Sequence, residues 1–298
     1  MKKARSINIS SARLLAIVAA VAAVSACGGG GGGGGGVPAF PLLPVTEPAP
    51  PPAPAPAPAP VSDTSGPCFN EADFREGTLV AFEAVKPGVN PATPSFSRKA
   101  VIEAREAFGG ANPIAVNVGS ENFSYPQFQQ STVKKEYKDL VNGSFLLYGK
   151  STTYKSKIDP SMAPSLPAGY ALEQVNTVSQ TFTPPFAFPV DMAPGQVVSQ
   201  QSTAAKTSVL NGRSNGATVS LPARGELTYH GREQLETPLG TFNTCKLSLK
   251  ITVGASVIVK EATREFWLAA EGPYRGQLLK GGDSKSSMLV TKMIYLPK

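Results

Sequence analysis

The sequence predicts a mainly β fold: a twisted antiparallel sheet or half-barrel with one short helix, preceded by a disordered tether. The first observation is the strict alternation of apolar and polar residues over 243–253, which is typical of a strand with one buried face. The second is a set of weaker alternating runs separated by Gly and Pro, as in an antiparallel meander. The third is a Gly/Pro/Ala-rich stretch near the N-terminus, which cannot pack a core.

Residues 1–26 have the features of a signal peptide. Lys2, Lys3, Arg5 and Arg13 form a basic start, and residues 14–24 contain only Leu, Ile, Val and Ala. This run is too short for the ~20 apolar residues of a membrane-spanning helix. We therefore expect it to be cleaved from the mature chain.

The end of this segment, Val24-Ser25-Ala26-Cys27, resembles the lipobox of bacterial lipoproteins. The resemblance implies that the lipoprotein signal peptidase cleaves before Cys27 and that the Cys27 thiol carries a diacylglycerol. The alternative is an ordinary secretory signal that happens to end near a cysteine. Gly28 stands where Asp is the familiar signal for inner-membrane retention, which implies an outer-membrane anchor facing the periplasm, with surface exposure also possible.

Residues 27–66 are predicted to be the lipidated Cys27 and a disordered tether. Nine consecutive glycines, residues 28–36, favour a flexible coil. The Pro/Ala alternation over residues 48–60 favours polyproline II, which has no internal hydrogen bonds. The remaining residues, 67–298, are long enough for one β-rich globular domain.

The strands of this domain are predicted from period-two patterning, clearest at residues 243–253. The weaker candidates are residues 78–84, 128–138, 144–158, 175–182, 225–235, 256–268 and 288–296.

The single predicted helix begins at Ser97, which can cap it, and ends at Gly109-Gly110. Its apolar positions are Ala100, Val101, Ala104 and Phe108. A helix of this length is expected to cover one end of a sheet.

With Cys27 occupied by lipid, Cys68 and Cys245 remain as a pair in a compartment that permits disulfides. A bridge between them would close a loop of nearly the whole domain. The alternative is two separate buried thiols, because Cys245 lies on the apolar face of its predicted strand.

The C-terminal half resembles a recurrent type of uncharacterised bacterial cell-envelope domain. The resemblance rests on residues 182–189 (FTPPFAFP), 194–196 (PGQ), 237–242 (TPLGTF) and 264–268 (REFWL). It implies a twisted antiparallel sheet curled into a half-barrel, and it implies no active site. In the turn at 237–242, Pro238 presets φ and Gly240 can take a positive φ.

The sequence offers little catalytic chemistry. The single histidine, His230, lies in a predicted strand without a nucleophile or further ligands at suitable spacing. Ser131 and Lys134 match the Ser-x-x-Lys pattern of penicillin-recognising enzymes, but their surroundings predict a strand where those enzymes have a helix. We therefore assign no catalytic, cofactor-binding or metal-binding residue and expect no cofactor.

Two sets of residues keep other functions open. Asp159, Glu173 and Asp191 can in principle pair for glycoside hydrolysis, although solvated loop charges are the alternative. The aromatic residues can line a concave apolar or sugar-binding face, with ordinary core positions as the alternative. This second set is Tyr229, Phe266, Trp267 and Tyr274.

Loss of residues 1–26 removes four basic and no acidic side chains, so the formal charge falls from +7 to +3. No dense Lys/Arg run remains, and nucleic-acid binding is not predicted. The sequence predicts a non-enzymatic module, held to the membrane by its lipid, for an envelope lipid, glycan or protein partner. The alternatives are an envelope hydrolase that uses paired carboxylates and a surface-displayed structural or adhesive module.

Overall fold

The computed structural model describes residues 63–86, 94–167, 169–255, 258–283 and 286–298. The predicted signal peptide, Cys27 and the predicted tether up to residue 62 lie outside the described residues.

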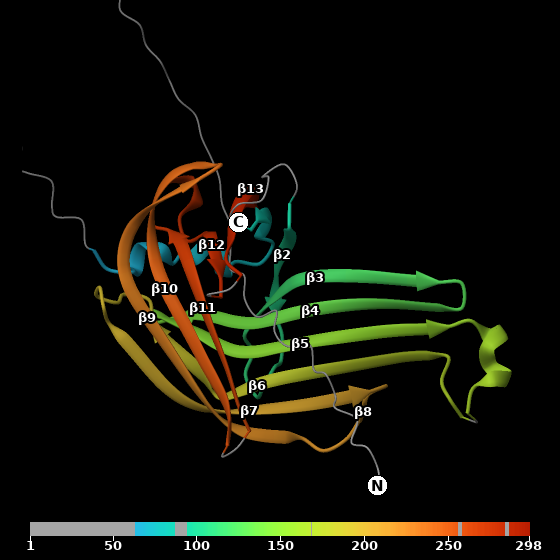
Figure 1. Ribbon diagram of the computed structural model, residues 1–298. Coiled ribbons are helices and arrows are strands. Elements are labelled where there is room, and N and C mark those ends of the chain that lie inside the picture. Colours follow the sequence, from blue (N-terminus) through green and yellow to red (C-terminus); the bar gives the residue numbers. More distant parts are fainter. Residues whose placement is uncertain (1–62, 87–93, 168, 256–257, 284–285) are drawn as a thin grey trace, which may run out of the picture. The chain divides into compact units, whose positions relative to one another are not determined.

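Twelve antiparallel strands of the described chain form a sheet that closes on itself (Figure 1). The strands of the ring, in chain order, are β1 (Leu79–Val85), β2 (Phe96–Arg105), β3 (Ile114–Tyr125), β4 (Phe128–Val141), β5 (Ser144–Ile158), β6 (Glu173–Pro189), β7 (Val197–Leu210), β9 (Val219–Thr237), β10 (Gly240–Ala255), β11 (Ile258–Ala269), β12 (Leu278–Gly282) and β13 (Met288–Leu296). The short strand β8 (Arg213–Ser214) pairs with the end of β7.

The predicted half-barrel is wrong, because the sheet is a closed barrel. Strand β6 pairs with β5 along one side and with β7 along the other, through residues from Asn176 to Thr183. Strand β1 pairs with the C-terminal strand β13, which joins the two chain ends of the sheet. Every strand of the ring is thus hydrogen-bonded to a neighbour on each side over at least part of its length.

Several strand predictions agree closely with the structure. The predicted ranges 144–158 and 288–296 match β5 and β13, and 243–253 lies within β10. The tight turn predicted between β9 and β10 is confirmed, since Gly240 has φ +126° and pairs with Thr237.

The helix predicted from Ser97 to Gly109-Gly110 is wrong: most of this segment is strand β2. Phe96, Arg98 and Ala100 stand opposite β1 in a regular ladder. The apolar spacing suggested a helix because Arg98, a charged residue, occupies an inward position of this strand. The helical segments that the structure describes are 3-10 turns: η1 (Gly66–Cys68), η2 (Glu71–Phe74), η3 (Pro160–Ser165) and η4 (Gly272–Tyr274).

One end of the barrel is covered by residues 63–77, which we call the N-terminal plug and which contains η1 and η2. Ser65 is fully buried, and its Oγ donates to the Val190 carbonyl (2.6 Å) and accepts from the Met192 amide (2.9 Å). Packing therefore begins slightly before the predicted domain boundary at residue 67. The plug lies at the end of the barrel where β4 ends and β5 begins.

The core inside the barrel is one continuous cluster of buried side chains from strands on all sides. A second, small cluster lies on the outer face, where the rings of Phe108 and Tyr137 stack with centroids 3.6 Å apart. The interior is thus the place where a ligand can be enclosed.

Candidate functional site

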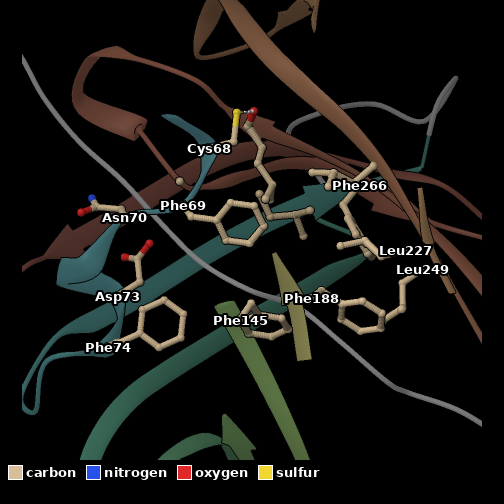
Figure 2. Close-up of a pocket in the computed structure, with 14 residues that line it drawn as sticks. Cys68, Phe69, Asn70, Asp73, Phe74, Phe145, Phe188, Leu227, Leu249 and Phe266 are labelled. Atoms are coloured by element: carbon tan, nitrogen blue, oxygen red, sulfur yellow. Dashed lines mark hydrogen bonds between the residues drawn. The ribbon is translucent and has the colours of Figure 1, made fainter. Parts of the chain in front are cut away.

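An apolar cavity of about 60 Å³ lies inside the barrel beneath the N-terminal plug (Figure 2). Its walls include Phe145, Phe188, Leu227, Leu249, Phe266 and Leu278. A water needs roughly 10–15 Å³ of such space and two to four polar partners. The cavity therefore has room for several heavy atoms but favours an apolar occupant.

Aromatic side chains of the plug form one wall of the cavity. Phe69 and Phe74 both pack against Phe145 of β5, with ring centroids 6.3 and 6.2 Å apart. Phe69 lies two residues before η2 and Phe74 is the last residue of η2, so this turn of the plug places both rings inside the barrel. Movement of the plug would open the cavity.

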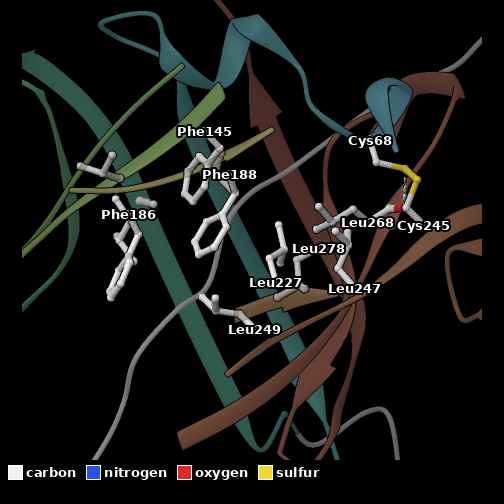
Figure 3. Close-up of a cluster of buried hydrophobic side chains, with 14 of the residues drawn as sticks. Cys68, Phe145, Phe186, Phe188, Leu227, Cys245, Leu247, Leu249, Leu268 and Leu278 are labelled. Carbon is white, nitrogen blue, oxygen red and sulfur yellow. Dashed lines mark hydrogen bonds between the residues drawn. A yellow bond between two sulfur atoms is a disulfide. The ribbon is translucent and has the colours of Figure 1, made fainter. Parts of the chain in front are cut away.

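The plug is fixed by the predicted disulfide between Cys68 and Cys245, which the structure contains (Figure 3). The two Cα atoms lie 6.1 Å apart, and both residues are buried. Cys245 lies on the inner face of β10, next to the cavity residue Leu247. The disulfide therefore ties the cover of the cavity to its wall.

A buried carboxyl group, Asp73, borders the cavity. Its Oδ1 accepts hydrogen bonds from Gln277 Nε2 (3.0 Å) and Tyr295 Oη (3.1 Å). Burial raises the pKa of Asp73 to about 7, although these donors and the charges of Lys138 and Arg275 act against that rise. The carboxyl group is thus partly protonated near neutral pH.

Charged side chains adjoin the cavity on the inner face of the barrel. Lys138 of β4 is only 2% exposed, and its Nζ lies 5.1 Å from the centroid of the Phe74 ring. Arg98 of β2 lies 3.3 Å from Glu136 of β4, measured from Nη2 to Oε1. Lys150 of β5 stands opposite Glu136 in the ladder. Burial lowers the pKa of Lys138 to about 8 and also lowers that of Lys150.

The predicted carboxylates are not gathered into a polar cleft. Asp159 is exposed and caps η3 by accepting from the Ser161 amide (2.8 Å). Glu173 is exposed and pairs with Lys157 (2.6 Å). Asp191 is exposed near the plug, at the other end of β6. Asp159 and Glu173 thus have local partners, and Asp191 lies at the opposite end of β6 from Glu173, an arrangement that does not favour glycoside hydrolysis.

The other candidate residues also lie apart. His230 is exposed on the outer face of β9 and shares a hydrogen bond with Ser248 Oγ (2.8 Å). Ser131 and Lys134 lie three residues apart on strand β4, so their side chains leave opposite faces of the sheet. They cannot act as a nucleophile and its base.

Of the four aromatic residues singled out in the sequence, Phe266 lines the cavity. Tyr229 is fully buried in the core, and Trp267 lies between Lys246 and Lys280, whose ammonium groups are 5.0 and 4.1 Å from its ring centroid. Tyr274 packs edge-on against Phe242. Phe69, Phe74 and Phe145 were not identified from the sequence. The proximity of two of them to Cys68 was the one available signal.

Within the described residues, no group of three or more His, Cys, Asp or Glu side chains is arranged to hold a metal ion. Among the same residues, no helix has the length and apolar character needed to cross a membrane.

No protein-family model matches the chain, and no curated protein matches it. One solved structure, of a Bacteroides fragilis protein described as exported and as having a YmcC-like fold, is similar over 74% of this chain and 96% of its own length. The identity is 12% and the TM-score is 0.25. At this TM-score the similarity assigns neither a fold nor a function to the chain.

Proposed function

We propose that this chain is a lipoprotein of the bacterial outer membrane, anchored through Cys27 and facing the periplasm, whose barrel binds an apolar group of an envelope component without catalysing a reaction. The observation that carries this proposal is the apolar cavity beneath the N-terminal plug. A closed barrel can enclose a small ligand in its interior. The disulfide supports the location, because such bonds persist in oxidising compartments.

The binding function is tested with N-phenyl-1-naphthylamine, an uncharged dye that fluoresces in apolar surroundings. We expect saturable fluorescence with the full chain. Leu249→Trp should fill the cavity and weaken dye binding at least ~10-fold, because Leu249 lines it. Ile294→Trp is the matched control, since Ile294 is 58% exposed on β13. Equal dye binding by both variants would refute the cavity as the binding site.

The anchor is tested separately. Cys27→Ser should abolish incorporation of labelled fatty acid and release the protein from the membrane fraction, while dye binding stays unchanged. Retention of the label by this variant would rule out Cys27 as the lipid attachment site.

A second candidate, a surface-displayed adhesive module, is favoured by the β3–β4 hairpin tip. Phe123 and Tyr125 are 51% and 61% exposed there, with ring centroids 4.7 Å apart. Exposed aromatic groups of this kind often mark interaction sites. Phe123→Ser with Tyr125→Ser should then reduce cell adherence and leave dye binding intact.

A further inference from the structure

The interior of the barrel changes from apolar to charged along strand β5. Phe145 and Leu147 belong to the core near the plug, whereas Lys150 stands opposite Glu136. A bulge at Gly149 produces this change: its φ is +141°, and a Cβ there would lie 2.0 Å from the Gln180 carbonyl oxygen. Because the bulge inserts one residue, Leu147 and Lys150 both face inward although they are three residues apart.

Positive charge exceeds negative charge in this part of the interior. Arg98, Lys138 and Lys150 surround one carboxylate, Glu136. Asp73, the other nearby carboxyl group, is partly protonated near neutral pH. Burial of cations without equal countercharge is costly. A bound anion would lower this cost by supplying the missing negative charge.

Arg98 has unused hydrogen-bonding capacity. Its side chain is 9% exposed, and its Nε and Nη2 are buried without a hydrogen-bond acceptor among the described residues. The Nη2 atom lies near Glu136, but not in hydrogen-bond geometry. A planar guanidinium suits a carboxylate or phosphate group.

Lys138 connects these charges to the cavity. Its Nζ lies over the Phe74 ring, and Phe74 lines the cavity. No described carboxylate forms a salt bridge with Lys138. Its charge interacts with that of Asp73 on the cavity wall and with those of Glu136 and Arg98 farther along the barrel. Apolar and cationic surfaces thus meet at this residue.

We propose that the ligand is an anionic amphiphile, with part of its acyl chain in the cavity beneath the plug and its carboxylate or phosphate group between Lys138 and Arg98. This inference rests on the proposed binding function and specifies its ligand class. The charge of the head group then provides part of the affinity and fixes the direction of the chain.

Isothermal titration of the full chain at pH 7 with decanoate, decyl phosphate and decan-1-ol tests the inference. These ligands share one chain and differ in the head group. We expect at least one of the two anions to bind about 10-fold or more tightly than the alcohol, because charge-assisted hydrogen bonds exceed neutral ones. Tighter binding of decanoate would indicate a fatty acid as the natural ligand, and tighter binding of decyl phosphate would indicate a phospholipid.

Arg98→Met should reduce this preference to near unity, and Lys138→Met should weaken it. Lys99→Met is the matched control, because Lys99 is the exposed neighbour on the same strand. Lys150→Met is a second test if Arg98→Met fails to fold, as judged by circular dichroism.

Equal affinity for anions and alcohol would overturn the inference and leave the apolar binding function in place. Absence of binding by all three ligands would overturn both. A preference for anions that survives every interior substitution would also overturn the proposed head-group site.

Discussion

The two ends of the barrel differ in how they are held together. At the plug end, Ser65, Cys68 and Asp73 are at most 2% exposed, although they contact segments more than 100 residues away in the sequence. At the hairpin end, where β3 turns into β4, Phe123 and Tyr125 are more than half exposed and contact each other.

This difference indicates where stability is concentrated. The hairpin end relies on local pairing and on exposed ion pairs such as Lys157–Glu173, whose side chains are 60% and 69% exposed. Such pairs contribute little. The plug end buries polar groups that are hydrogen-bonded to distant partners. Local opening should therefore begin at the hairpin end, while loss of the plug should affect the whole domain.

The largest effect should follow removal of the disulfide. Cys68→Ser with Cys245→Ser frees a loop spanning a sequence separation of 177, and we expect the free energy of unfolding to fall by roughly 2–5 kcal/mol. Chemical denaturation of the full chain measures this loss. Dye binding should weaken as well, because Phe69 and Phe74 would no longer be held against Phe145.

The control is the native sequence treated with reductant, which should lose a similar amount of stability. A change of less than about 0.5 kcal/mol in both samples would show that hydrogen bonds and apolar packing hold the plug without the disulfide. The disulfide would then not explain why the plug end is more stable than the hairpin end.

Sequence patterning identified the strands whose inner residues are consistently apolar. In β10, Cys245, Leu247 and Leu249 all face the core, so the alternation was plain. Strand β7 was missed because its buried positions are Ser202 and Ala204, which are small or polar. Strand β2 was taken for a helix because Arg98 occupies an inward position. Strands whose inward positions are small, polar or charged were therefore not recognised from alternation.

Sequence patterning could not predict the closure of the barrel or the cavity inside it. Closure depends on the pairing of β6 with β7, which local alternation does not encode. The cavity combines plug residues with strands far along the chain, such as Phe69 with Phe266. The disulfide could be predicted because only two cysteines remained after Cys27 was set aside.

The second effect concerns pH at the plug end. The pKa of Asp73 is about 7 in the folded chain and near 4 in the unfolded chain. Its contribution to stability is therefore fully present below about pH 4 and is lost as the pH rises through 7. Asp73→Asn imitates the protonated form. We expect the free energy of unfolding of this variant to exceed that of the native chain by about 4 kcal/mol at pH 8 and to match it at pH 4.

Urea denaturation of the native chain and of Asp73→Asn at a series of pH values gives the free energy of unfolding of each against pH. The difference between the two curves reports on Asp73, because the other groups titrate alike in both proteins. Glu71→Gln is the control, because Glu71 is an exposed carboxylate of the same plug. Parallel curves for Asp73→Asn and the native chain would show that Asp73 ionises normally.

The smallest effect should come from the hairpin end. Phe123→Ser with Tyr125→Ser should change the free energy of unfolding by less than about 0.5 kcal/mol, because both rings are mostly exposed. The comparison substitution at the plug end is Phe74→Ser, which removes an aromatic contact with Phe145 and should cost at least ~2 kcal/mol. Amide hydrogen exchange should show fast exchange in the β3–β4 tip of all these proteins. If the hairpin substitutions cost as much as Phe74→Ser, the two ends are equally coupled to folding, and the contrast between them fails.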